Sequence, residues 1–370
     1  MVYIAEQILR AQPYQAGKPI AELAREAGLS EAGILKLASN ENPLGMSPLA
    51  QSRAAAALAD SALYPDANGF ALKAALSERF DVPPEWLTLG NGSNDILELL
   101  ASTFLAPGKS AVFSQYAFIV YAQATLRVGA QSIAVPATEY GHDLDAMLAA
   151  IRPDTTVVFI ANPNNPTGTY LSFAQLDAFL ARVPPQVLVV LDEAYNEYLP
   201  PALRFDSIAW VRARHNVLIT RTFSKAYGLA GLRVGYAISR PEAAEYMNRI
   251  RQPFNVSNVA QAAAIGALED DAFRNNTYEA NLKGLAQLSA GLAALQIPVV
   301  EPHGNFVLAR FGTAAAAINT FLLRQGIIVR PVAGYGLGEW LRISVGLPHE
   351  NQRVLTALAD YFKLPESGHD

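Results

Sequence analysis

The 370-residue sequence contains no cysteine. Disulfide frameworks, thiolate nucleophiles and sulfur-ligated metals are therefore excluded. Histidine is scarce as well, and the i, i+4 spacing that places two imidazoles on one helix face is missing. The five histidines are His142, His215, His303, His349 and His369. We therefore expect no catalytic metal.

Long apolar runs and an excess of basic residues are also missing. No stretch approaches the roughly 18 uninterrupted apolar residues of a membrane helix. The formal net charge of -5 argues against a nucleic-acid or anionic-membrane partner. The first segment, MVYIAEQILRAQPY, carries Glu6 and Arg10 and lacks the features of a secretory signal. We expect a cytoplasmic protein whose partner is a small molecule.

The hydrophobic content of 51% is enough for a large core and a second, smaller one. Between residues 86 and 240, short β-branched runs alternate with helix-like segments, a pattern typical of parallel strands with helices on both faces. The candidate strands are WLTLG, SAVFSQ, SIAVP, TVVFIAN, QVLVVLDE, NVLITRT and RVGYAIS. The predicted fold class is α/β with a mainly parallel central sheet.

The pattern of predicted strands and helices changes after two long helical segments between Asn258 and Leu295. Strand-like IPVVE, NFVLARF, GIIVRPV and EWLRISVG then alternate with helical segments, which indicates a compact α+β unit. We predict an N-terminal arm (1–45), a large domain (46–270) and a small domain (271–370).

The segment LGNGSNDILELL leads from a strand through glycines into a helix that begins near Ser93. Main-chain N–H groups of Ser93, Asn94 and Asp95 at such a helix start form an anion site. An ordinary capped helix is the alternative. The spacing does not match GxGxxG, so the sequence does not support a dinucleotide site.

Polar side chains follow two further strands. In IANPNNPTG, Asn165 follows a buried strand, where its amide can donate to a ring hydroxyl or oxyanion, although a rigid turn also explains the motif. In VLVVLDEAY, Asp192 ends a buried strand, with Tyr195 three residues later. A buried carboxylate needs a cation or donors beside it, and capping a helix would also satisfy Asp192.

Lys225 in TFSKAYGLAGLRVG stands between small residues after the apolar run NVLIT. Most lysines are solvated, and a loop lysine is the simplest interpretation. Beside an anion loop, an amide turn and a strand-end aspartate, however, this lysine is suited to forming a Schiff base with an aldehyde cofactor.

In this order, the motifs resemble those of the fold-type I pyridoxal-phosphate-dependent aminotransferases, and within their class II the histidinol-phosphate aminotransferase group. The likeness covers nearly the whole chain and includes LASNENPLG, YPDANG, NPNNPTG, LDEAY, TFSKAYGLAGLRVG and GIIVRPVAGYGLGEWLRISVG. It implies pyridoxal 5'-phosphate as cofactor and a homodimer. It also implies transamination between histidinol phosphate and 2-oxoglutarate in histidine biosynthesis.

The resemblance also assigns roles to residues. It makes Lys225 the Schiff-base lysine, Asp192 the partner of the pyridine nitrogen, and Tyr195 a hydrogen-bond donor to the ring oxygen. The implied cofactor contacts are Ser93, Asn94, Phe118, Asn165, Asp192, Tyr195, Thr222, Ser224, Lys225, Arg233 and, from the neighbouring subunit, Tyr64. For the substrate it implies Asn165, Arg342 for the carboxylate, and Arg330 with Tyr14 for the phosphate.

Paired arginines match carboxylate and phosphate oxygens, although strand-edge arginines are often simply solvated. An aromatic amino-acid aminotransferase and a threonine-phosphate decarboxylase remain alternatives on the same scaffold. A nucleotide-binding oxidoreductase and a non-enzymatic ligand-binding protein are alternatives from other classes. The first lacks its fingerprint, and the second predicts no covalent cofactor.

Overall fold

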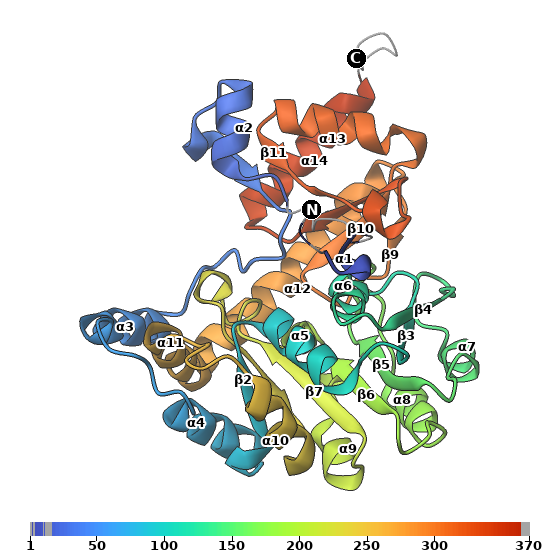
Figure 1. The fold of residues 1–370 in the computed structure, drawn as a ribbon. Coiled ribbons are helices and arrows are strands. Elements are labelled where there is room, and N and C mark those ends of the chain that lie inside the picture. Colours follow the sequence, from blue (N-terminus) through green and yellow to red (C-terminus); the bar gives the residue numbers. More distant parts are fainter. Residues whose placement is uncertain (1, 3, 10, 12–16, 364–370) are drawn as a thin grey trace.

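The computed structural model describes residues 2, 4–9, 11 and 17–363. The chain forms two units, a large one around a central sheet and a smaller one above it in Figure 1. The long helix α12 (Asp271–Ala294) runs between them. No helix in the described ranges combines the length and the apolar character that crossing a membrane requires.

The large unit is organised by a sheet with the strand order β2-β8-β7-β6-β5-β3-β4. Neighbours from β4 to β7 pair in parallel, as the alternating pattern of the sequence predicted. The carboxyl ends of these strands therefore share one edge. The strands are β2 (Leu87–Gly90), β3 (Ser110–Ser114), β4 (Gln131–Val135), β5 (Thr155–Ala161), β6 (Leu188–Asp192), β7 (Val217–Thr222) and β8 (Gly235–Ile238).

Strand β8 departs from the parallel arrangement predicted for residues 86–240. It is antiparallel to both of its neighbours, β7 and β2. The chain between Thr222 and Gly235 is a loop with a 3-10 turn at Ala230–Leu232. Because a parallel return needs a crossover connection, usually a helix, this loop brings β8 back antiparallel. The sheet remains mainly parallel, as predicted.

Helices cover both faces of the large sheet, and the strand residues alternate between two apolar layers. Val158 and Ile160 pack into one layer, whereas Val157 and Phe159 pack into the other. The first layer contains α3 (Pro48–Ala57), α4 (Phe70–Phe80), α7 (Leu144–Ala149), α8 (Phe173–Leu180), α9 (Ile208–Ala213) and α11 (Asn258–Glu269). The second contains α5 (Ser93–Phe104), α6 (Val120–Arg127) and α10 (Pro241–Ile250).

The small unit is an antiparallel sheet of order β12-β13-β10-β9 packed against helices. Its elements are β9 (Val299–Val300), β10 (Phe306–Arg310), α13 (Ala315–Arg324), β11 (Ile327–Ile328), β12 (Arg330–Pro331), β13 (Trp340–Ser344) and α14 (Pro348–Lys363). This mixture of strands and helices is the α+β unit that the sequence predicted.

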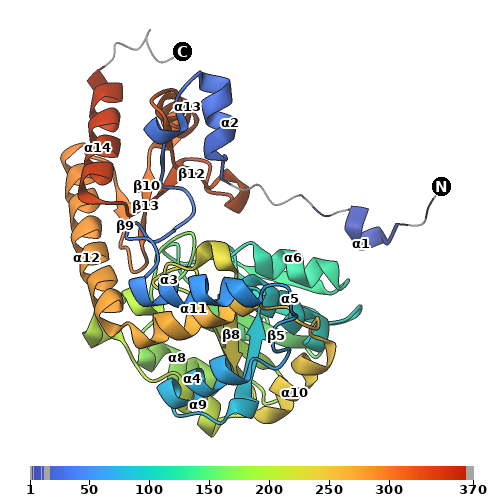
Figure 2. The same ribbon diagram turned by 90° about the vertical axis from the view of Figure 1, so that its left-hand side faces the viewer.

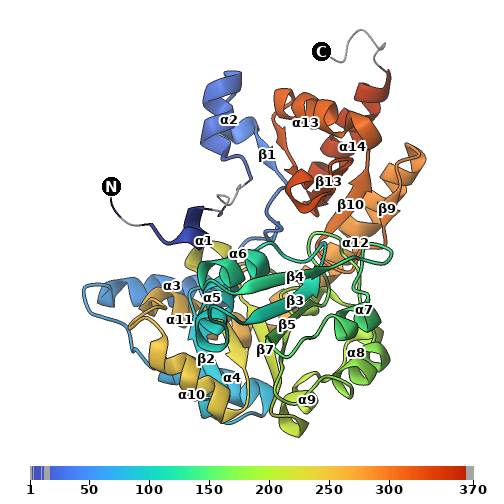
Figure 3. The same cartoon turned by 45° about the vertical axis from the view of Figure 1, so that its right-hand side comes forward.

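Part of the N-terminal segment joins the small unit. Strand β1 (Leu35–Lys36) pairs in parallel with β11, and Figure 3 shows it beside the small unit. Helix α2 (Ile20–Ala27) lies close to α13, whereas α1 (Glu6–Leu9) lies apart, near α6 (Figure 2). We propose that the two domains divide near residue 270, where α11 ends and α12 begins.

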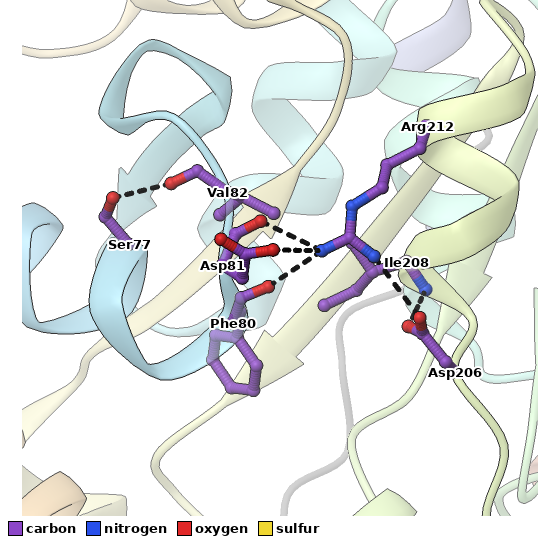
Figure 4. A network of polar contacts seen from close by, with 7 residues as sticks. All are labelled: Ser77, Phe80, Asp81, Val82, Asp206, Ile208 and Arg212. Atoms are coloured by element: carbon purple, nitrogen blue, oxygen red, sulfur yellow. Dashed lines mark hydrogen bonds and ion pairs between the residues drawn. The ribbon is translucent and has the colours of Figure 1, made fainter.

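At the amino end of β7, far from the small unit, Arg212 joins two helices (Figure 4). Its Nη2 donates to the main-chain oxygens of Phe80 and Asp81 at 3.2 and 2.9 Å, at the end of α4. Its Nη1 donates to the Asp206 carboxylate at 3.2 Å, just before α9. The guanidinium thus satisfies carbonyl groups that the helix end leaves without partners.

Candidate active site

A cavity of about 210 Å³ lies between the carboxyl edge of the large sheet and the small unit. Many of the residues singled out in the sequence line it together. They are Ser93, Asn94, Phe118, Asn165, Asp192, Tyr195, Thr222, Ser224, Lys225, Arg233, Arg330 and Arg342. The parallel register explains the convergence: Asp192 at the end of β6 is level with Ala161 of β5 and Thr220 of β7.

Lys225 follows β7 and reaches the cavity. Its Nζ donates to the main-chain oxygen of Ser39 at 3.0 Å. Burial, and then the positive charges of Arg342 and Arg233, lower the pKa of Lys225 to about 8, against the opposing effects of Glu41 and Asp192. Near neutral pH about a tenth of this amine is therefore unprotonated, far more than for an ordinary lysine, and this is the form that attacks a carbonyl carbon.

Asp192 presents a carboxylate that is only 5% exposed. Burial raises its pKa, opposed first by a hydrogen bond from the Tyr121 hydroxyl to Oδ2 at 2.8 Å. The sequence analysis did not identify Tyr121 as a site residue. The general rule that a buried tyrosine needs a polar partner does not say which partner it has. A desolvated carboxylate of this kind is stabilised by a cation placed beside it.

Helix α5 starts at the cavity without a side-chain cap, because its N-cap is Gly92. A Cβ at Gly92 would lie 2.3 Å from Arg233 Nη2, and one at Gly235 would lie 2.6 Å from the main-chain nitrogen of Ser93. Glycine at both positions lets a guanidinium and a helix N-terminus approach each other. Together they form a positively polarised wall suited to an anion.

Arg233 extends this wall. Its Nη1 donates to Ser224 Oγ at 3.3 Å, and Nη2 donates to the main-chain oxygen of Asn91 at 3.4 Å. The Thr222 hydroxyl accepts from the main-chain N–H of Ser224 at 3.1 Å, which fixes the turn before Lys225. The Ser224 hydroxyl thus lies against the guanidinium, and Thr222 orders the adjoining turn.

Two arginines enter from the small unit. Arg330 and Arg342 face each other across β12 and β13 as register partners. Arg342 is 6% exposed; its Nη1 donates to Asn165 Oδ1 at 2.5 Å and its Nη2 to the main-chain oxygen of Ala38 at 2.7 Å. This pair gives the cavity a second positively charged wall, which suits a ligand that carries anionic groups.

Tyr195 lines the cavity and is 4% exposed. Burial raises its pKa to about 12, although Arg342 and a hydrogen bond from Asn40 oppose that shift. The Asn40 Nδ2 donates to the Tyr195 hydroxyl oxygen at 2.9 Å. The phenol therefore keeps its proton near neutral pH. Asn40 lies within the LASNENPLG motif, but the sequence assigned it no role.

One predicted site residue, Tyr64, does not line the cavity. Tyr64 is 82% exposed and stacks on Phe254 with the ring centroids 4.6 Å apart. Tyr14 lies outside the described residues. Within the described part of the chain, no group of three His, Asp or Glu side chains is arranged to hold a metal ion.

Residues 32–358 match the aminotransferase class I and II family, and the chain belongs to that family. The sequence is 60% identical over 349 residues to histidinol-phosphate aminotransferase 1 of Cupriavidus pinatubonensis, an alignment that spans 94% of this chain and 93% of that relative. It is also 60% identical over 357 residues to histidinol-phosphate aminotransferase 1 of Thiobacillus denitrificans, spanning 96% and 93%.

The fold has a similar counterpart among solved structures. Histidinol-phosphate aminotransferase from Sinorhizobium meliloti, in complex with pyridoxal-5'-phosphate, superimposes with a TM-score of 0.88 at 28% identity over 97% of each chain. The family and fold inferred from the sequence are thereby confirmed.

Proposed function

We propose that the protein binds pyridoxal 5'-phosphate in this cavity and transfers an amino group from L-histidinol phosphate to 2-oxoglutarate, reversibly, giving imidazole acetol phosphate and L-glutamate. This reaction belongs to histidine biosynthesis. The observation that carries the proposal is one cavity lined by an amine of lowered pKa, Lys225, and a buried carboxylate, Asp192. The identity to two histidinol-phosphate aminotransferases supports the substrate assignment.

The wall of the cavity suits the cofactor's phosphate. A phosphate dianion fits the uncapped start of α5 at Ser93 and Asn94 together with the Arg233 guanidinium. The hydroxyl groups of Thr222 and Ser224 add donors there. The observation that supports this fit is the glycine at 92, where any side chain would occupy the place of Arg233.

The rest of the cavity suits the ring. Asp192 would hold the pyridine nitrogen in its protonated form, since that cation stabilises the desolvated carboxylate. Asn165 and Tyr195 would donate to the ring oxygen, and Phe118 would lie against the ring face. When bound, the cofactor supplies an electron-withdrawing ring that stabilises negative charge on the substrate's α-carbon.

Lys225 would move the proton. Its Nζ, with a pKa lowered to about 8, would take the proton from the substrate's α-carbon and release it again as the amino group is transferred. The Ser39 main-chain oxygen, which accepts from Nζ at 3.0 Å, keeps the amine within the cavity.

The arginines of the small unit would select the substrates. We assign Arg342 to the α-carboxylate of glutamate, because its Nη1 already donates to the Asn165 side chain in the cavity wall. We assign Arg330 to the phosphate of histidinol phosphate, together with Tyr14 and Asn165. A guanidinium binds both anions through paired N–H donors.

We further propose a homodimer in which Tyr64 reaches the cofactor phosphate of the partner. The surface around Tyr64 supports this arrangement, because three neighbouring apolar side chains are also exposed. Leu63 is 71% exposed, Phe70 78% and Phe254 41%. Exposed apolar patches of this kind mark protein interfaces. A cytoplasmic location remains our prediction.

A substrate panel tests the proposal. We expect wild-type kcat/KM to be highest for histidinol phosphate, compared with phenylalanine and threonine phosphate. Arg330→Ala should lower kcat/KM for histidinol phosphate about a hundredfold, because a charge-assisted contact is lost, and should leave the reaction with glutamate nearly unchanged. Arg310→Ala, which removes a surface ion pair with Glu339, is the matched control.

Preference for either of the other two substrates would overturn the substrate assignment. An equal loss with glutamate and histidinol phosphate in Arg330→Ala would overturn the role of Arg330 alone.

A further inference from the structure

Residues 38–40, hereafter the strap, contact three side chains of the cavity one after another. The main-chain oxygen of Ala38 accepts from Arg342, and that of Ser39 accepts from Lys225. The next residue, Asn40, donates from its side chain to the Tyr195 hydroxyl. Among these contacts only the last depends on a side chain of the strap, so only Asn40 can be tested by substitution.

The orientation of Asn40 is fixed on every side. The residue is 1% exposed and has a φ of 54°, which asparagine tolerates better than most residues. Its main-chain N–H donates to Ser344 Oγ at 2.9 Å, and that hydroxyl donates in turn to Asn40 Oδ1 at 2.8 Å. Its main-chain oxygen accepts from Asn305 Nδ2 at 3.0 Å. Because Oδ1 is occupied, Nδ2 is the group that faces Tyr195.

This orientation determines which way the Tyr195 hydroxyl donates. The hydroxyl oxygen already accepts the Asn40 N–H, and a neighbouring amide nitrogen cannot accept a proton in return. The hydroxyl proton is therefore left to point elsewhere, and Tyr195 lines the cavity. An N–H donated to the hydroxyl oxygen also polarises the O–H bond and makes it a stronger donor.

We propose that Asn40 is a positioning residue that holds the Tyr195 hydroxyl as a donor toward the ring oxygen of the bound cofactor. The inference rests on the proposed function, which places that oxygen beside Tyr195. A hydrogen bond donated to an oxygen favours its anionic form. Asn40 thereby lowers the pH at which the bound cofactor loses its proton, without touching the cofactor.

The readout is the midpoint of the pH titration of the bound cofactor's visible absorbance. Asn40→Gly removes the amide and accepts the positive φ without strain. We expect the midpoint to rise by up to about one pH unit, the change that complete loss of the Tyr195 hydrogen bond to the ring oxygen would produce. Among the described residues, the charged and titratable groups that face Tyr195 are Lys225, Asp192, Arg342, Tyr121, Tyr198 and Tyr335, and Asn40→Gly replaces none of them.

A double-mutant cycle separates positioning from a structural role. In a Tyr195→Phe background, Asn40→Gly should leave the midpoint where Tyr195→Phe alone puts it, because the hydroxyl is already gone. Asn42→Ala is the matched control, since Asn42 donates to the Ala226 main-chain oxygen and to Thr277 but not to Tyr195. It should lower the melting temperature and leave the midpoint unchanged.

Asn40→Asp provides a second variant if Asn40→Gly does not fold, because aspartate has the same shape but cannot donate. Its midpoint shift should be larger in the wild-type background than in Tyr195→Phe. An unshifted midpoint in Asn40→Gly, or equal shifts in both backgrounds for either variant, would overturn the inference. If the wild-type protein acquires no visible absorbance from the cofactor, the proposed function itself fails.

Discussion

Arg342 and Arg212 both donate to main-chain carbonyl oxygens, but they do so at opposite ends of the large sheet and in different surroundings. Arg342 is 6% exposed and contacts an amide oxygen and a carbonyl in the cavity wall. The Arg212 side chain is 39% exposed and lies near two carboxylates, those of Asp81 and Asp206 (Figure 4).

The difference in burial decides whether an arginine contributes to the chemistry of the site or only to the stability of the fold. Around Arg212, solvent and carboxylates screen the charge, so what remains is the hydrogen bonding of a helix end. Around Arg342, burial preserves the field of the guanidinium, and that field lowers the pKa of Lys225. Each of the following predictions substitutes a residue either at the cavity or at the opposite end of the sheet.

The largest effect should come from Lys225. Lys225→Gln removes the amine whose pKa the cavity lowers, so transaminase kcat should fall at least about a thousandfold. Steady-state kinetics and circular dichroism should show lost activity in a folded protein. Lys109→Gln, at an exposed position, is the control and should retain wild-type kcat. Near-normal turnover in Lys225→Gln would rule out this lysine as the base.

Arg342→Gln should produce the next largest effect. The kcat/KM for glutamate should fall about a hundredfold or more, because a buried charged partner is lost. Without the neighbouring cation, the pKa of Lys225 should rise from about 8. Since the unprotonated amine is the reactive form, the rate at which apoenzyme combines with pyridoxal phosphate should then reach its half-maximum at a higher pH.

Arg342→Lys distinguishes charge from geometry. It keeps a cation in place, so the pH midpoint of cofactor binding should stay near that of wild type. The planar fork that donates to Asn165 and Ala38 from two separate nitrogens is lost, since an ammonium group presents all its donors from one atom, and kcat/KM for glutamate should still fall. A midpoint that shifts equally in both variants would contradict an electrostatic origin.

Arg212→Ala should have the smallest effect, and only on stability. Loss of its hydrogen bonds to the end of α4 should lower the free energy of unfolding by about 1 kcal/mol. Urea unfolding measures this change, and kcat/KM should stay within about twofold of wild type. Arg249→Ala, which removes the exposed pair with Glu245, should leave the free energy of unfolding nearly unchanged, because solvent screens that pair. A kinetic defect in Arg212→Ala would mean that the two ends of the sheet are coupled.

The sequence was informative wherever a function depends on a strand end. Apolar runs predicted β5, β6 and β7, and the shared edge of parallel strands brought Asn165, Asp192 and Lys225 together. The parallel direction predicted for β8 was wrong, because local composition does not distinguish a helical crossover from an irregular loop.

The residues that hydrogen-bond to Tyr195 and Asp192 could not be predicted from the sequence, for a different reason. Asn40 meets Tyr195 across 155 positions of sequence, and Tyr121 meets Asp192 across 71. Neither pair lies on one element, so no periodicity or spacing links them. Their contacts arise only when the N-terminal segment and helix α6 pack against the sheet.

The pairing of β1 with β11 has a consequence for the order of assembly. The strands of the large sheet all lie between residues 87 and 238, so a chain emerging from the ribosome can complete that sheet early. Strand β1 and the strap, although synthesised early, lack their partners in the small unit until β11 and β13 have left the exit tunnel. We therefore expect a nascent chain on the ribosome to bind pyridoxal phosphate weakly. Tight binding should begin only when the full-length chain has been released.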